Sequence, residues 1–128
     1  MILDVLIVED DFFIALDLED QVKELGHRVV GVARDVESCK ATATQTPPDI
    51  ALMDIRLARG SSGIDASRWL YDTLDVRCIF ISGNLDDATR ELLSAVEPLA
   101  FIGKPIMPHL LERELTKSSE AMGRPAAD

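Results

Sequence analysis

The sequence predicts an α/β protein: a doubly wound, five-stranded parallel sheet with helices on both of its faces. Two observations point to this fold class. Five short apolar runs alternate along the 128 residues with five longer segments of helical periodicity, and this alternation is typical of parallel sheets with right-handed crossovers. Four of the runs also end on charged or polar residues, as strands do at the functional edge of such a sheet.

Up to residue 54 the expected order is a strand over 2–8, a helix over 12–25, a strand over 28–33, a helix over 35–45 and a strand over 49–54. The first run is β-branched and almost wholly apolar, which favours a strand buried on both faces. Asp11 can cap the helix after it and Gly26 can end that helix. The second helix begins at Asp35, is rich in Thr and has few apolar residues, so we expect it to be the least stable element.

Beyond the loop at residues 55–62 we expect a helix over 64–74, a strand over 76–82, a helix over 86–96, a strand over 99–102 and a helix over 108–117. Gly60 and Gly63 give the loop its turn chemistry. Pro105 breaks the chain after the last strand, and Pro108 suits the first turn of the last helix. Residues 1–117 are therefore expected to form the domain, and residues 118–128 a flexible tail.

The composition excludes several classes of function. The chain is 47% apolar and 28% charged, no apolar stretch reaches the roughly 18 residues of a membrane span, and no basic start marks a secretion signal. We therefore expect a cytoplasmic protein without membrane contact, and Cys39 and Cys78 as free thiols. The net charge of −10 argues against direct nucleic-acid binding and fits protein partners or divalent cations.

Charged and polar side chains follow the strands where each one ends. Glu9 and Asp10 follow the first strand, Asp54 ends the third, Ser82 ends the fourth, and Lys104 follows the fifth. In a parallel sheet these ends meet at one edge, so we expect a phosphorylation site there. Carboxylates about 4 Å apart repel by several kcal/mol, which a proton or a hard divalent cation would relieve. An Asp54 side chain more than about 10 Å from Asp10 or Lys104 would refute this expectation.

Four segments along the chain resemble the response-regulator receiver domain, the phosphoacceptor module of two-component signalling. The segments are Val8–Asp11, Leu52–Ile55, Phe80–Gly83 and Phe101–Pro105. Each is weak alone, but together, in this order and spacing, they are highly specific, and the resemblance covers about residues 2–117. It implies a flavodoxin-like (βα)5 fold with the strand order 2-1-3-4-5.

The resemblance also implies roles for the residues at the strand ends. Asp54 would be the phosphoacceptor, Lys104 would pair with it and then with a phosphate oxygen, and Ser82 would bind the phosphoryl group as the switch residue. The bond between Lys104 and Pro105 is cis in this family. Each role has an alternative. Asp54 could be an ordinary turn residue, Lys104 a solvated charge and Ser82 a capping hydroxyl.

A magnesium ion is the cofactor that the resemblance implies, with Mn²⁺ or Ca²⁺ as substitutes. Asp10, Asp54 and the backbone carbonyl of Arg56 would ligate it directly, and Glu9 would act largely through water. The alternative is a helix N-terminus that favours acidic residues through capping and its dipole. This alternative explains Asp11 well, but not the acids of both strands together.

Three positions depart from the family pattern or are expected to tune it. Phe101 stands where the family usually has a switch aromatic, often Tyr, and we weigh that role evenly against a core Phe because it lacks the hydroxyl. Arg56 and Asn84 flank the path of a hydrolytic water, so we expect them to set the lifetime of the acyl phosphate. The loop after Asp54 lacks the family's usual Pro and is one residue longer before Gly63.

The favoured function is a single-domain phosphoacceptor receiver rather than a turnover enzyme. Its expected partners are a sensor histidine kinase or a histidine phosphotransfer protein, and a downstream protein that reads its phosphorylation state. The chain itself is expected to be a monomer or a weak dimer. A phosphate sink and a degenerate receiver that acts only in docking remain alternatives. A haloacid-dehalogenase phosphatase is disfavoured because Arg56 stands where it needs a second Asp. A nucleotide- or flavin-binding module is disfavoured because Glu9, Asp10 and Asp11 would repel phosphate.

Overall fold

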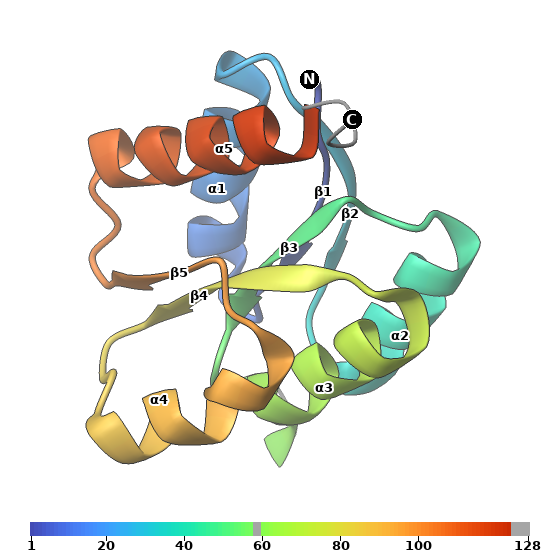
Figure 1. Cartoon of the computed structure of the whole chain (residues 1–128), viewed down its shortest axis with the longest axis vertical. Helices are drawn as coiled ribbons and strands as arrows, with labels where there is room; N and C mark the ends of the chain where they lie inside the picture. Colours follow the sequence, from blue (N-terminus) through green and yellow to red (C-terminus); the bar gives the residue numbers. More distant parts are fainter. Residues whose placement is uncertain (58–59, 124–128) are drawn as a thin grey trace, which may run out of the picture.

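A five-stranded parallel sheet in the order β2-β1-β3-β4-β5 forms the centre of the computed structural model, which describes residues 1–57 and 60–123 (Figure 1). Its strands are β1 (Asp4–Val8), β2 (Arg28–Ala33), β3 (Ile50–Asp54), β4 (Arg77–Ser82) and β5 (Ala100–Gly103). All four pairings are parallel. The predicted fold class, strand order and strand positions are therefore confirmed.

Helices cover both faces of this sheet, with α1 and α5 on one face and α2, α3 and α4 on the other (Figure 1). The helices are α1 (Phe12–Glu24), α2 (Val36–Gln45), α3 (Gly63–Leu74), α4 (Asp87–Leu93) and α5 (Pro108–Gly123), and a short 3₁₀ turn (Ser94–Val96) continues α4. The side chains of Asp11, Asp35 and Asp86 each accept a backbone N–H in the first turn of the helix that follows. These caps satisfy donors that have no partner inside a helix, which explains where the helices begin.

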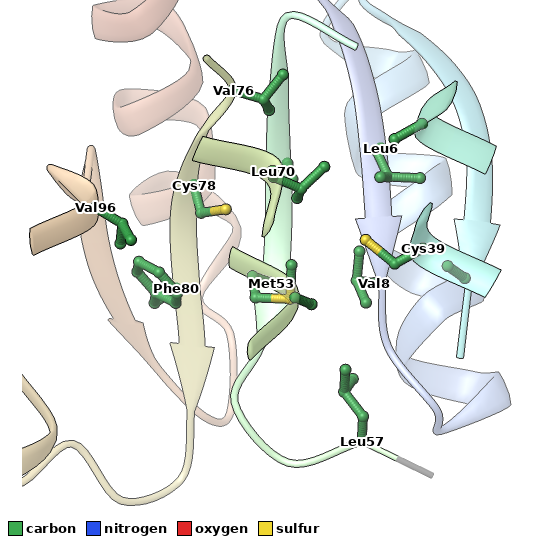
Figure 2. Packing of buried hydrophobic residues seen from close by; sticks show 14 of the residues in the cluster. Leu6, Val8, Cys39, Met53, Leu57, Leu70, Val76, Cys78, Phe80 and Val96 are labelled. Carbon is green, nitrogen blue, oxygen red and sulfur yellow. The ribbon is translucent and has the colours of Figure 1, made fainter. Parts of the chain in front are cut away.

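Two apolar cores lie on the two faces of the sheet because successive side chains of a strand point to opposite sides. Figure 2 shows the core under α2 and α3, which includes Leu6, Val8, Met53, Cys78 and Phe80. The core under α1 and α5 includes Val5, Ile7, Leu52, Ile79 and Ile81. The central strands are thus buried on both faces, which accounts for their nearly continuous apolar sequence.

The helix α5 corrects one expectation drawn from the sequence. We expected it to end near Lys117 and residues 118–128 to form a tail, but the helix continues to Gly123. Ser118 and Ser119 are buried, and the Ser119 hydroxyl donates to the backbone carbonyl of Met1. Small side chains let this last part of α5 pack against the start of the chain, and residues 124–128 lie outside the described residues.

The two cysteines agree with the expectation of free thiols. Cys39 and Cys78 are free and buried (Figure 2), and burial raises the pKa of both thiols. Among the described residues, no helix is both long and apolar enough to cross a membrane.

Candidate functional site

A cavity of about 530 Å³ opens at the carboxyl edge of the sheet, where the strand ends meet. It is lined by Glu9, Asp10, Asp11, Ile14, Asp54, Arg56, Leu57, Ser82, Gly83, Asn84 and Lys104. The strand register brings these segments together, because Val8 pairs with Met53, Asp54 with Ile81, and Ser82 with Gly103. The five strand-end residues predicted from the sequence therefore line one cavity.

Asp54 ends β3 as a buried carboxylate, with only 6% of its surface exposed. Its Oδ1 accepts the backbone N–H of Arg56 at 3.3 Å. The first residue of α3, Gly63, packs directly on the Asp54 backbone, since a Cβ there would lie 2.0 Å from the Asp54 carbonyl oxygen. Only glycine fits this approach, so the sequence fixes α3 against the strand end that carries the carboxylate.

Glu9 and Asp10 follow β1, and the two carboxylates differ in burial and in partners. Glu9 is 2% exposed, and its Oε2 accepts the backbone N–H of Asp11 at 3.1 Å. Asp11 caps α1 by accepting the N–H groups of Phe13 and Ile14. Capping therefore explains Asp11, as expected, but it does not explain the buried Glu9.

The ammonium of Lys104 lies between the two buried carboxylates. Its Nζ is 3.0 Å from Glu9 Oε1 and 3.3 Å from Asp54 Oδ2. Burial lowers the pKa of Lys104, but its contacts with Glu9 and Asp54 outweigh burial and raise that pKa above its ordinary value. The lysine is therefore charged at neutral pH and is shared by both acids. The bond between Lys104 and Pro105 is cis, as the resemblance implied.

One lysine does not neutralise this cluster of acids. Burial, and after it the contact with Asp54, raises the pKa of Glu9 from 4.5 to about 7, although Asp11 and Lys104 act in the opposite direction. Desolvation disfavours a buried carboxylate, and a second carboxylate beside it adds to the penalty. The free energy of this edge would fall if a proton or a further cation bound there.

The oxygen atoms at this edge fit a hard divalent cation. Carboxylate oxygens of Glu9, Asp10 and Asp54 all lie within 4.8 Å of one another. Glu9 Oε1 is buried and has no well-oriented hydrogen bond among the described residues, although it forms an ion pair with Lys104 at 3.0 Å. The carbonyl of Arg56 likewise accepts no hydrogen bond from that part of the chain. Carboxylate and carbonyl oxygens with room for water are the ligand set that Mg²⁺ prefers.

The hydroxyl of Ser82 is engaged within its own turn. Ser82 is buried at the end of β4, its Oγ accepts the N–H of Asn84 at 3.1 Å, and its hydroxyl lies 3.4 Å from the carbonyl of Asn84, to which it donates. A Cβ added at Gly83 would meet no atom within 4 Å, so the space beside it is open. The turn therefore holds the hydroxyl by weak local bonds next to an open cavity.

Phe101 is half-buried on β5, and its ring stacks on Phe80 with 5.7 Å between the ring centroids. The guanidinium of Arg90 lies over the same ring, 4.7 Å from its centroid. The sequence interpretation missed Arg90, because no periodicity links a charged helix residue to a strand 11 positions later. It also listed Gly63 only as a turn residue, and the close approach that requires glycine has no signature in one sequence.

Residues 58 and 59 of the loop after Asp54 lie outside the described residues, and the extra length expected before Gly63 stays a prediction. Leu57 is buried against the core under α2 and α3, and it also lines the cavity. Backbone bonds join Gly63 to Ile55 and Leu57 to Ser61, which close the loop into a short antiparallel bridge.

Comparison with known proteins gives one family and a consistent group of relatives. A family model described as the response regulator receiver domain matches residues 5–116. The phyllosphere-induced regulator PhyR of Methylorubrum extorquens is 43% identical over 110 residues, which are 84% of this chain and 40% of that protein. The chain thus spans less than half the length of this relative.

Two solved structures are similar to most of the chain. The receiver domain of the Erythrobacter litoralis PhyR response regulator has a TM-score of 0.81 at 31% identity, and the match covers 99% of this chain and 97% of that one. The anti-anti-sigma factor PhyR of Bartonella quintana has a TM-score of 0.78 at 32% identity, covering 95% of this chain and 49% of that one.

Proposed function

Because the chain belongs to the response regulator receiver domain family of two-component signalling, we propose that Asp54 accepts a phosphoryl group from the phosphohistidine of a sensor kinase or a phosphotransfer protein. A downstream protein then binds according to the phosphorylation state. The chain itself is proposed to be a signalling switch and not a turnover enzyme. The observation that carries the proposal is the position of Lys104, within 3.3 Å of Asp54 and 3.0 Å of Glu9 at the mouth of the acidic cavity.

The chemistry at Asp54 is a transfer between two nucleophiles. A carboxylate oxygen of Asp54 bonds to phosphorus while the bond from phosphorus to the donor imidazole nitrogen breaks, and the imidazole leaves with the electron pair. A carboxylate is a weak nucleophile, so catalysis comes from alignment and from positive charge around the phosphoryl oxygens. Lys104 is placed to supply part of that charge, since its Nζ already touches the Asp54 carboxylate.

The acidic edge is proposed to hold Mg²⁺, which would neutralise charge on the phosphoryl group when it is bound, and Mn²⁺ or Ca²⁺ could substitute. Asp10, Asp54 and the Arg56 carbonyl would ligate it, with Glu9 acting mainly through water. Two observations support this set: the short distances among the carboxylate oxygens, and the buried Glu9 Oε1, which accepts no well-oriented hydrogen bond from the described residues. Glu9 then serves as a buried negative charge that favours a cation at this position.

Ser82 is proposed to transmit the change. Its hydroxyl would exchange the bonds with Asn84 for a bond to a phosphoryl oxygen, which moves the turn between β4 and α4. Such a shift biases a two-state domain only by the difference in free energy between the two sets of contacts. The local bonds of Ser82 are weak, so this difference favours the phosphorylated arrangement.

An apolar surface beside the cavity is proposed to contact the protein donor. Phe12 and Phe13 begin α1 and are 71% and 78% exposed, and their rings pack edge to face. Phe13 also lines a second hollow with Lys104 and Pro105. Large apolar side chains exposed side by side are typical of protein interfaces. Changing Phe12 and Phe13 to Ser should slow transfer from a phosphorylated protein donor and leave transfer from acetyl phosphate unchanged.

The experiment that tests the proposal is intact mass spectrometry after incubation with acetyl phosphate and Mg²⁺. The wild type should gain one phosphoryl group, and Asp54→Asn, which keeps the shape of the side chain, should gain none. An equal gain in both proteins would overturn the assignment of Asp54. If neither protein gains a phosphoryl group from acetyl phosphate, and the wild type gains none from a phosphorylated kinase either, the result would favour the degenerate receiver that acts only in docking.

The fate of the phosphoryl group separates a regulator from a phosphate sink. A regulator should hold the group long enough to change its binding to a partner, whereas a sink should lose it without such a change. One relative is named a phyllosphere-induced regulator and another an anti-anti-sigma factor. These names favour a regulator with a protein partner. Arg56 and Asn84 line the cavity and are proposed to set the lifetime. An unchanged dephosphorylation rate in Arg56→Ala would exclude Arg56 from that role.

A further inference from the structure

Phe101 lies between two different partners. One face of its ring stacks on Phe80, with 23° between the ring planes, and Phe80 is fully buried. The guanidinium of Arg90 lies 4.7 Å from the ring centroid. A ring held in this way is not free to turn between inward and outward positions without losing the contact with Arg90. The two-position aromatic switch that the family resemblance suggested for Phe101 is therefore constrained in this chain.

The contact with Phe101 is the main interaction of the Arg90 side chain. Within residues 1–57 and 60–123, Arg90 makes no ion pair with a carboxylate. A guanidinium over an aromatic face is attracted by the partially negative face of the neutral ring, and it is less strongly hydrated than an ammonium. Arg90 therefore joins α4 to β5 through this ring.

The helix that carries Arg90 has few other anchors. The described α4 spans only seven residues, and Leu93 is its one buried side chain. Three residues, 83–85, separate Ser82 from the cap of this helix at Asp86. A movement of Ser82 toward Asp54 would therefore pull on the first turn of α4, and Arg90 would resist that movement through Phe101.

The same contact lies close to the groups of the site. Phe101 pairs with Phe80 in the sheet, and two residues further along the same two strands Ser82 pairs with Gly103. The N–H of Lys104 donates to the carbonyl of Ser82 at 3.0 Å. Arg90 thus contacts β5 at Phe101, two residues before Gly103, the strand partner of Ser82, and three residues before Lys104.

We propose that Arg90 is a positioning residue that stabilises the unphosphorylated arrangement by clamping Phe101 against Phe80, and that phosphorylation acts against this clamp. The inference rests on the proposed function and specifies its regulation. A contact that is made in one of two states changes their equilibrium, when it is lost, by the amount that it contributed there. Removal of the guanidinium should therefore make a phosphoryl group, or an analogue of it, bind more tightly.

The test compares the affinity for beryllofluoride with Mg²⁺, a stable analogue of the phosphoryl group, by isothermal titration calorimetry. An exposed cation–π contact predicts about two- to five-fold tighter binding in Arg90→Gln than in wild type. Arg90→Lys keeps the charge but not the flat stacking group, so its affinity should fall between the two. Arg68→Gln, an exposed arginine of α3, makes the same change of charge away from the clamp and should bind as wild type does.

Thermal unfolding separates this role from a merely structural one. Arg90→Gln should lower the Tm of the free protein by about 2 to 4 °C and leave the Tm of the beryllofluoride complex unchanged, since the clamp is absent there. In a Phe101→Leu background, Arg90→Gln should have no further effect on affinity, because the ring is the partner of the guanidinium.

Three outcomes would overturn the inference. One is an affinity of Arg90→Gln equal to that of wild type. Another is the same gain in Arg68→Gln or in the Phe101→Leu background, which would point to charge alone. The third is an equal loss of Tm in the free protein and in the complex. If the wild type itself fails to bind beryllofluoride, the proposed function fails first, and that result is seen before any variant is compared.

Discussion

The two edges of the sheet each carry a pair of acidic residues, but they satisfy them in different ways. At the amino edge, Asp49 accepts the backbone N–H of Asp4 at 2.7 Å, and Asp4 pairs with Arg28 at 2.6 Å. At the carboxyl edge, Glu9 and Asp54 are buried and share one lysine, and Glu9 Oε1 accepts no hydrogen bond of good geometry from residues 1–57 and 60–123.

The difference separates a pair that stabilises the fold from a pair that the proposed function would use. Acids that accept backbone bonds and face an arginine stabilise the sheet as it stands. Acids that are desolvated beside one another destabilise it until something positively charged binds. Stability is therefore given up at the edge that is proposed to hold magnesium and phosphate, and the experiments below test this contrast.

The largest expected effect is the loss of Lys104. Lys104→Met should lower the free energy of unfolding without magnesium by about 2 to 3 kcal/mol, because two buried carboxylates lose their common cation. This figure is below the range for fully buried pairs because a quarter of the lysine side chain is exposed. Denaturation by urea measures it.

Arg28→Gln is the matched control at the amino edge. Its side chain is 68% exposed, and pairs of this kind contribute at most about 1 kcal/mol. Equal losses in the two variants would show that the edges do not differ in the way that their geometry indicates.

The next largest effect compares the same change, Asp to Asn, at the two edges. It should change the free energy of unfolding in opposite directions. Asp54→Asn should raise the free energy of unfolding in the absence of magnesium by about 1 to 2 kcal/mol, because burial raises the pKa of Glu9 most and the Asp54 carboxylate, which the change neutralises, raises it further. Asp49→Asn should lower it by about 1 kcal/mol, because the charged acceptor of the Asp4 N–H becomes neutral. Urea denaturation in EDTA measures both, and a loss of stability in Asp54→Asn would contradict the contrast.

The third effect is the increase in the free energy of unfolding that Mg²⁺ causes, which should depend on acids of the carboxyl edge alone. At a free concentration ten times its Kd, Mg²⁺ should raise the free energy of unfolding of the wild type by about 1.4 kcal/mol. Asp10→Asn should lose most of this increment, whereas Asp4→Asn should keep it, since Asp4 lies at the opposite edge. Unfolding curves in Mg²⁺ and in EDTA give the increments, and a full increment in Asp10→Asn would remove Asp10 from the ligand set.

The strand ends explain why so much of the fold and the site followed from the sequence. Runs such as the one that ends on Asp54 combine continuous burial with a terminal charge, and parallel pairing leaves one place for those charges to meet. The observed distance between Lys104 and Asp54, 3.3 Å, is far inside the limit of about 10 Å that the sequence interpretation required.

What the sequence did not predict depends on contacts between distant side chains. The last part of α5 was expected to be a tail because residues 118–128 are small and polar, yet small side chains pack there against Met1. The contact of Arg90 with Phe101 joins a charged residue to a ring on another element, which no local pattern records. Both are tertiary effects that outweigh local propensity.

The smallest effect concerns the pH dependence of the amino edge. His27 Nδ1 accepts the backbone N–H of Leu3 at 3.0 Å, so this nitrogen carries no proton in the folded chain. Burial, and then the positive N-terminal amino group, lowers the pKa of His27 below 6.5. A lowered pKa means that the unfolded chain binds the proton more readily, so this contribution is present above pH 6.5 and is lost as the pH falls through the pKa of the folded state.

His109 provides the matched control, because it is the second of the two histidines and is exposed on α5. Between pH 7.5 and pH 5, the wild type should lose slightly more stability toward urea than His27→Gln does, and His109→Gln should behave as the wild type. The comparison at each pH cancels the titration of Glu9, which all three proteins share. If His27→Gln loses as much stability as the wild type, the bond between His27 and Leu3 is not sensitive to pH, and the amino edge is indifferent to protons as well as to magnesium.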